Sequence, residues 1–300
     1  MLFLFFRILS LLFFFISDSL WIKPIKNQVA NYRLIFYRSV LTSLLFSGIY
    51  FLIRSHWFDF GISYQFIKFT LDVSILDLLA IVSLCAFSFF GLYFFTSSLY
   101  TNKFSFVTPL MSSGFVFSIL VATFLNKSTI NTATLVAFFI FFIAILFIAK
   151  QFTYRDFKLL LLPILLTHFF WDSAVVLYPI AIQKMGIIPF CLIMELTVCL
   201  MSFLFCIIKD KGRFFHFLSN EIRLYYFRII VMAICITTAI FLLSFSILNL
   251  SIVLIISIGL FMKLVRVLYG YFFLNEKLNN RELFILLLLT SAGVIVSVSN

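Results

Sequence analysis

Long apolar runs follow one another along almost the whole of this 300-residue chain. A helix needs about 20 apolar residues to cross the hydrocarbon core of a bilayer, and these runs reach that length. Hydrophobic residues make up 64% of the sequence and charged residues only 11%. A soluble domain has no way to bury so much apolar surface, and continuous runs are not the alternating pattern of a transmembrane barrel. The sequence therefore predicts an all-α, polytopic membrane protein.

The apolar runs predict ten spans joined mostly by short loops. They run approximately over 2–21, 34–53, 75–99, 104–125, 132–149, 159–182, 188–208, 224–248, 251–274 and 283–298. The longest loops, 54–74 and 209–223, are too short to form a domain, so we expect one bundle of ten helices. We expect the first span to be retained, because it lacks both a basic segment ahead of its apolar core and a small-residue cleavage site.

The positive charge of the chain lies mainly between the predicted spans. The net charge is +11, but no soluble basic domain is present, so we do not expect a nucleic-acid partner. The cations crowd the loops after spans one, five and seven: Lys23, Lys26, Lys150, Arg155, Lys158, Lys209, Lys211 and Arg213. The positive-inside rule places these loops in the cytoplasm and both termini outside. We expect a multi-pass protein of the inner membrane, in contact with the lipid bilayer.

The two halves of the chain, 1–150 and 151–300, resemble each other. The fourth span ends in Phe124-Leu125-Asn126 and the ninth in Phe273-Leu274-Asn275, while Asp18-Ser19 in the first span matches Asp172-Ser173 in the sixth. Five spans in each half would give the halves opposite orientations in the membrane. Two inverted five-helix repeats with polar residues near the midplane are typical of secondary transporters.

Six charged residues inside the predicted spans form the candidate substrate-binding site. They are Asp18, Arg38, Asp172, Glu195, Lys263 and Arg266. A Lys or Arg at the centre of a membrane helix costs roughly 2.5–3.5 kcal/mol, so such residues usually face a partner or a pathway. Lys263 and Arg266 share one helical face, where we expect them to hold the anionic group of a substrate. The carboxylates would bind an amine or carry a coupling proton.

Internal pairing is the alternative interpretation of these charges. Glu195 with Lys263, or Arg38 with Asp18, would neutralise each other without binding any substrate. Asp18 and Arg38 also lie nearer the span ends. A second alternative is that their side chains extend to the membrane–water interface.

No motif indicates an enzyme, a cofactor or a metal site. HExxH, GxSxG and P-loop motifs are absent from the sequence. His168 and Asp172 are four positions apart, but with three His in the chain and no second ligand pair, a hydrogen-bonded core histidine is favoured over a metal site. The five Cys lie in apolar runs without CxxC spacing, which favours buried thiols. A membrane enzyme acting on lipid-linked substrates stays open, because lone catalytic residues escape motif searches.

Five local motifs resemble those of the EamA family of the drug/metabolite transporter superfamily, over essentially the whole chain. They are Ser17-Asp18 through Lys23 in span one, Phe36-Tyr37-Arg38 in span two, Ser98-Leu99 in span three, Thr108-Pro109 in span four, and Leu274-Asn275-Glu276-Lys277-Leu278 after span nine. The chain departs from the family pattern where Phe15-Ile16 replaces Trp-Gly, Lys127 replaces Glu and Ile258 replaces the Pro of span nine. Lys263 and Arg266 are not part of the general pattern either.

The resemblance implies alternating access around a cavity lined by spans one to four and six to nine. It also implies termini in the cytoplasm, opposite to the charge distribution. We expect a secondary active exporter of a small organic metabolite, an amino-acid-like zwitterion or an organic anion, driven by a proton or counter-substrate. The alternative within transport is efflux of amphipathic cations through Asp18, Asp172 and Glu195. Gly293 and Ser297 have the small-residue spacing of a helix contact or a homodimer.

Overall fold

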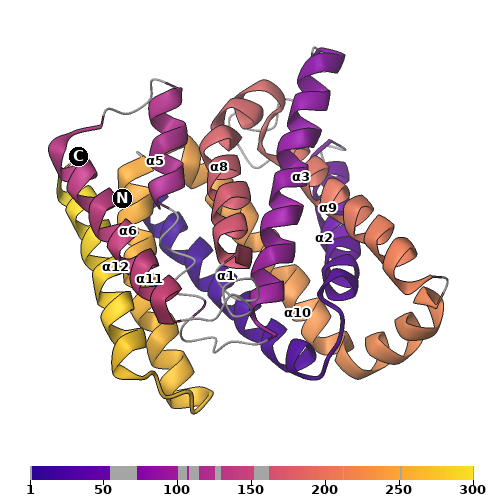
Figure 1. Cartoon of the computed structure of the whole chain (residues 1–300). Helices are drawn as coiled ribbons and strands as arrows, with labels where there is room; N and C mark the ends of the chain where they lie inside the picture. The colour runs from indigo at the N-terminus through magenta and orange to yellow at the C-terminus, as the bar shows by residue number, and fades with distance from the viewer. Residues whose placement is uncertain are drawn as a thin grey trace. The chain divides into compact units, whose positions relative to one another are not determined.

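The computed structural model describes residues 2–54, 73–100, 107, 115–125, 130–151, 162–211, 213–250 and 252–299. These residues form helices and short connections, with no strand among them (Figure 1). The helices are α1 Leu2–Lys26, α2 Asn31–Arg54, α3 Ile75–Ser98, α5 Phe115–Phe124, α6 Thr132–Gln151, α8 Leu162–Met185, α9 Ile187–Asp210, α10 Phe214–Asn249, α11 Ile252–Phe273 and α12 Asn280–Ser299. The predicted all-α class is confirmed for the described ranges.

Six of these helices are long and apolar enough to cross a membrane, judged by length and composition: α1, α2, α3, α8, α9 and α10. A shorter apolar stretch, Thr132–Phe147, lies in α6. The chain is therefore a helical membrane protein by composition, and the count of ten spans stays a prediction. The family-like pair Thr108-Pro109 and the departure at Lys127 lie outside the described residues.

Helix α10 begins earlier than the sequence predicts. We expected a loop over 209–223 and a helix from 224, but the helix starts at Phe214. Phe214 is only 4% exposed and packs edge-on against Phe36 and Phe203. Glu221, one turn before the expected start, forms an ion pair with Arg33 of α2. The loop prediction over 214–223 is wrong because contacts with other helices stabilise a helix in this segment of mixed polar and apolar composition.

The described helices form two compact units, and each unit draws on both halves of the sequence. Unit 1 comprises Met1–Phe89 and Leu177–Asn249, and unit 2 comprises Phe90–Val176 and Leu250–Asn300. Helices α3 and α8 each contribute to both. In unit 1, α10 packs on α1, α2 and α9, and α2 also packs on α9; in unit 2, α12 packs on α6 and α11 (Figure 1).

One end of unit 1 gathers the end of α1, the start of α2, the end of α9 and the start of α10. The Asn27 side chain donates a hydrogen bond to the Tyr225 hydroxyl over 2.7 Å, and the Tyr32 hydroxyl donates to an Asp210 carboxylate oxygen over 2.6 Å. The interior of the unit is apolar and aromatic. Its largest fully buried side chains are those of Trp21, Ile25, Leu34, Ile35, Phe46, Phe89 and Phe190.

Within unit 2, α3 and α8 approach each other closely. A Cβ at Gly91 would lie 2.9 Å from the Trp171 Cβ, which is closer than real Cβ atoms come. The rings of Phe90 and Phe94 lie against Phe170, with centroids 5.4 and 6.0 Å away. Because glycine has no side chain, Gly91 permits the aromatic contact between the two helices.

Candidate substrate site

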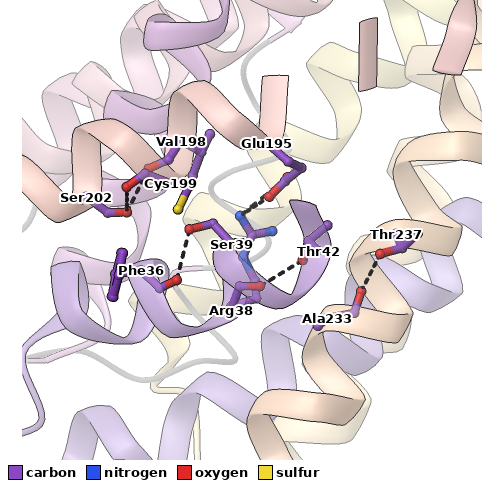
Figure 2. A network of polar contacts seen from close by, with 10 residues as sticks. All are labelled: Phe36, Arg38, Ser39, Thr42, Glu195, Val198, Cys199, Ser202, Ala233 and Thr237. Atoms are coloured by element: carbon purple, nitrogen blue, oxygen red, sulfur yellow. Dashed lines mark hydrogen bonds and ion pairs between the residues drawn. The ribbon is translucent and has the colours of Figure 1, made fainter. Parts of the chain in front are cut away.

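Arg38 of α2 and Glu195 of α9 form an ion pair inside unit 1 (Figure 2). The Arg38 Nη2 atom lies 3.0 Å from Oε2 and 3.4 Å from Oε1 of Glu195. The two side chains are 3% and 2% exposed. Water is thus excluded from both charges, and each depends on the other for neutralisation.

Figure 2 draws four hydroxyl groups from three helices with this pair, and each is bonded within its own helix. Ser39, Thr42, Ser202 and Thr237 each donate a hydrogen bond to a carbonyl three or four residues earlier, over 2.7 to 3.0 Å (Figure 2). A hydroxyl that donates in this way keeps lone pairs that can accept a further bond. These four hydroxyls therefore retain the capacity to accept a further hydrogen bond.

The Arg38 guanidinium also has one hydrogen-bond donor that is not used among the described residues. Its Nε atom is buried and has no hydrogen-bond partner among the described residues. An unsatisfied buried donor costs roughly 1–3 kcal/mol. Such costs are concentrated at sites where a ligand or an ordered water completes the bonding.

The observed pairing joins two residues that the sequence offered to other partners. Arg38 meets Glu195, whereas the internal pairings considered from the sequence were Arg38 with Asp18 and Glu195 with Lys263. Arg38 also does not extend toward a helix end, because its guanidinium is held at the buried carboxylate. The physical reason is that α2 packs along α9, which the sequence of neither helix reveals.

The remaining candidate residues are distributed over both units. Asp18 is buried on α1 in unit 1, at 6% exposure. Arg266 is partly buried on α11 in unit 2, and Lys263 is on the same helix with a side chain outside the described part of the structure. Of the six predicted site residues, the described contacts bring Arg38 and Glu195 together.

Asp172 of α8 is engaged with His168 one turn earlier. The His168 Nδ1 atom lies 2.7 Å from an Asp172 carboxylate oxygen, and the His168 side chain is 2% exposed. The imidazole also stacks on Phe117 at an interplanar angle of 13°. The prediction of a hydrogen-bonded core histidine is confirmed.

A second polar cluster in unit 1 was not predicted. Arg33 Nη1 lies 3.0 Å from a Glu221 oxygen, and Arg33 Nε lies 3.9 Å from an Asp210 oxygen. The Tyr32 hydroxyl donates to Asp210, and the Tyr37 hydroxyl donates to Glu221 over 2.9 Å. This cluster ties the start of α2 to the end of α9 and the start of α10. The one sequence signal for it is an acid, Asp210, between two lysines.

Comparison with known proteins shows a shared fold. No family model matches the chain, and no curated protein matches it. One crystal structure of a protein matches over 97% of this chain and 96% of its own, with a TM-score of 0.55 and 12% sequence identity. At that identity the likeness shows the fold alone, so the helical arrangement of this chain also occurs in a solved protein of nearly equal length.

Proposed function

We propose that this chain is a secondary active transporter that exports a small organic metabolite across the inner membrane by alternating access. The substrate class that fits best is an amino-acid-like zwitterion. The buried Arg38–Glu195 pair carries the proposal, because it places one cation and one anion together within helices long and apolar enough to span a bilayer. Ionisable residues inside membrane helices usually mark a substrate or ion pathway.

A zwitterion matches both members of the pair. Its carboxylate would replace Glu195 at the planar guanidinium of Arg38, whose geometry suits a carboxylate. Its ammonium group would replace Arg38 at Glu195. Separating a buried pair leaves two uncompensated charges, and a zwitterion compensates both at once. A simple anion or an amphipathic cation compensates only one, which favours the zwitterion over the alternatives.

Helix packing supports the inverted repeat on which alternating access depends. The first repeat would comprise α1, α2, α3, α5 and α6, and the second would comprise α8 to α12 in the same order. In this correspondence α9 is the counterpart of α2 and α12 is the counterpart of α6. Each of these helices packs on its own counterpart. The contact of α1 with α10 has its counterpart in the contact of α8 with α3, at Ser88–Tyr178 and Phe90–Phe170. The resemblance to the EamA family, which has such repeats, points in the same direction.

In this proposal Arg38 takes the anion-binding role that the sequence suggested for Lys263 and Arg266, and Glu195 keeps the amine-binding role that the sequence suggested for the carboxylates. The sequence has no P-loop, so a proton or a counter-substrate would supply the energy.

Counterflow in sealed liposomes tests the proposal. The purified chain is reconstituted, the vesicles are loaded with unlabelled amino acids, and uptake of labelled solute is measured. The panel comprises zwitterions, carboxylates without an amine, and amines without a carboxylate. We expect uptake of zwitterions only, lost in Arg38→Gln and retained in Arg281→Gln, which alters an exposed cation on α12. Preferential uptake of amines would favour cation efflux, and conversion of a lipid-linked substrate in detergent would favour an enzyme.

A further inference from the structure

Helix α10 is longer than a membrane crossing requires. Its 36 residues rise about 54 Å at 1.5 Å per residue, whereas the hydrocarbon core is about 30 Å thick. Residues 229–249 contain no charged side chain and are by themselves long enough to cross. Residues 214–228 contain Glu221, Arg223 and Arg228. This leading segment of α10, residues 214–228, therefore begins outside the hydrocarbon core.

The inner face of the leading segment is bound to unit 1. Phe214 and Tyr225 are each 4% exposed. The Arg33 guanidinium lies 4.0 Å from the centre of the Phe217 ring and pairs with Glu221. The segment is thus fixed in place by the helices around it, with one face turned toward them.

The exposed side of the leading segment carries aromatic and apolar side chains interspersed with the polar His216, Ser219, Asn220 and the cation Arg223. Phe215 is 73% exposed and Phe227 is 68% exposed. Further exposed apolar side chains on this segment are Ile222, Leu224 and Tyr226. A helix with aromatic side chains on one face and basic residues beside them is typical of segments that lie in the membrane interface.

The charges exposed around this face are all positive. In the described parts of 20–33 and 207–228 the only acids are Asp210 and Glu221, whose side chains are 5% and 13% exposed. Both are turned toward Arg33 and the two tyrosines of α2. The exposed cations are Lys23, Lys26, Lys209, Lys211, Arg213 and Arg223.

We propose that the leading segment of α10 is an interfacial anchor that binds anionic phospholipid headgroups. Lys209, Arg213 and Arg223 would contact the phosphates, and Phe215 and Phe227 would insert among the first carbons of the acyl chains. Charge complementarity identifies the occupant, because the local acids are buried and only cations face outward. The apolar surface between the cations distinguishes a lipid from a soluble anion. This proposal is independent of what the chain transports.

Lipid-dependent thermal unfolding of the full chain in detergent tests the anchor. Tm is measured while phosphatidylglycerol, or phosphatidylcholine with the same acyl chains, is added. The test variant is Lys209→Gln/Arg223→Gln, and the matched control is Lys277→Gln/Arg281→Gln, which removes two exposed cations from unit 2. A lipid that binds the native state raises Tm. We expect phosphatidylglycerol to raise Tm by several degrees more than phosphatidylcholine in wild type and control, and less than half as much in the test variant.

Three results would overturn the anchor. The first is an equal effect of the two lipids on the wild type. The second is an equal loss in the test and control variants, which would indicate a response to total charge. The third is reproduction of the phosphatidylglycerol effect by inorganic phosphate, which would indicate a site for a free anion. If the double variant does not fold, the single variants Lys209→Gln and Arg223→Gln give the same comparison.

Discussion

Replacing Glu195 with leucine should leave the Arg38 guanidinium buried without a counter-charge. At the observed 3.0 Å and an effective dielectric constant of about 20, the attraction between the two charges is about 5.5 kcal/mol. Removing one partner of a buried pair costs about 3–5 kcal/mol in measured cases. We therefore expect Glu195→Leu and Arg38→Met each to lower the free energy of unfolding by about 3–5 kcal/mol.

The double variant Arg38→Met/Glu195→Leu should recover most of this loss. It removes both charges, and apolar replacements of a buried pair are often neutral or stabilising. We expect its free energy of unfolding to lie within about 1 kcal/mol of the wild type, which, with single losses of about 3–5 kcal/mol each, corresponds to a coupling energy of about 6–10 kcal/mol. The free energies are measured by denaturant titration in detergent, followed by helical circular dichroism. The same proteins are then assayed for counterflow in liposomes.

Stability and transport together separate a structural pair from a substrate site. If Arg38 and Glu195 bind the substrate, the double variant is stable and inactive. A stable double variant with wild-type transport would refute the substrate site while leaving the ion pair intact. Losses that simply add in the double variant would refute the coupling, and with it the reasoning from the 3.0 Å contact.

Two further variants test packing and hydrogen bonding, both by thermal unfolding in detergent. Gly91→Ala forces a Cβ against α8 and should lower the free energy of unfolding by about 1–3 kcal/mol. The control Gly48→Ala has nothing within 4 Å of the new Cβ and should raise it by roughly 0.5–1 kcal/mol. Equal effects of the two variants would contradict the close approach of α3 and α8. Tyr32→Phe removes the donor to the Asp210 carboxylate and should lower the free energy of unfolding by about 1.5–3 kcal/mol. The control Tyr226→Phe changes an exposed tyrosine and should alter the free energy of unfolding by no more than about 0.5 kcal/mol. Equal losses for both tyrosines would show that the Tyr32–Asp210 hydrogen bond contributes nothing to stability.

The elements of the fold were largely predictable because apolar run length is a local property. The spans predicted at 34–53 and 188–208 correspond to α2, Asn31–Arg54, and α9, Ile187–Asp210. The start of α10 was not predictable, since Phe214 and Glu221 are stabilised by side chains of other helices. The segment mixes polar and apolar residues in a way that predicts no span by itself, and its contacts with other helices favour the helix here.

The two charges that the structure pairs were recognisable in the sequence, but their pairing was not. Arg38 and Glu195 stood out because a charge inside an apolar run is costly. Which charges meet depends on the packing of α2 along α9, and the sequence offered Asp18 and Lys263 equally well. The Arg33 cluster was missed for a different reason. Cations at span ends are ordinary, so nothing in the sequence distinguished Arg33 from its neighbours.

The separation of Arg38 and Glu195 along the chain has a consequence for biosynthesis. The two residues are 157 positions apart, and a ribosome adds about 5–20 residues per second, so roughly 8–31 s pass between them. Throughout this interval α2 holds a cation with no carboxylate from α9 to meet it. During synthesis, α2 must therefore keep Arg38 near the headgroups or beside the insertion machinery. It reaches its final position only after α9 has been synthesised and Glu195 can pair with Arg38. Chains that stop before Glu195 keep an unmatched charge in the membrane, which makes them natural targets for membrane proteases.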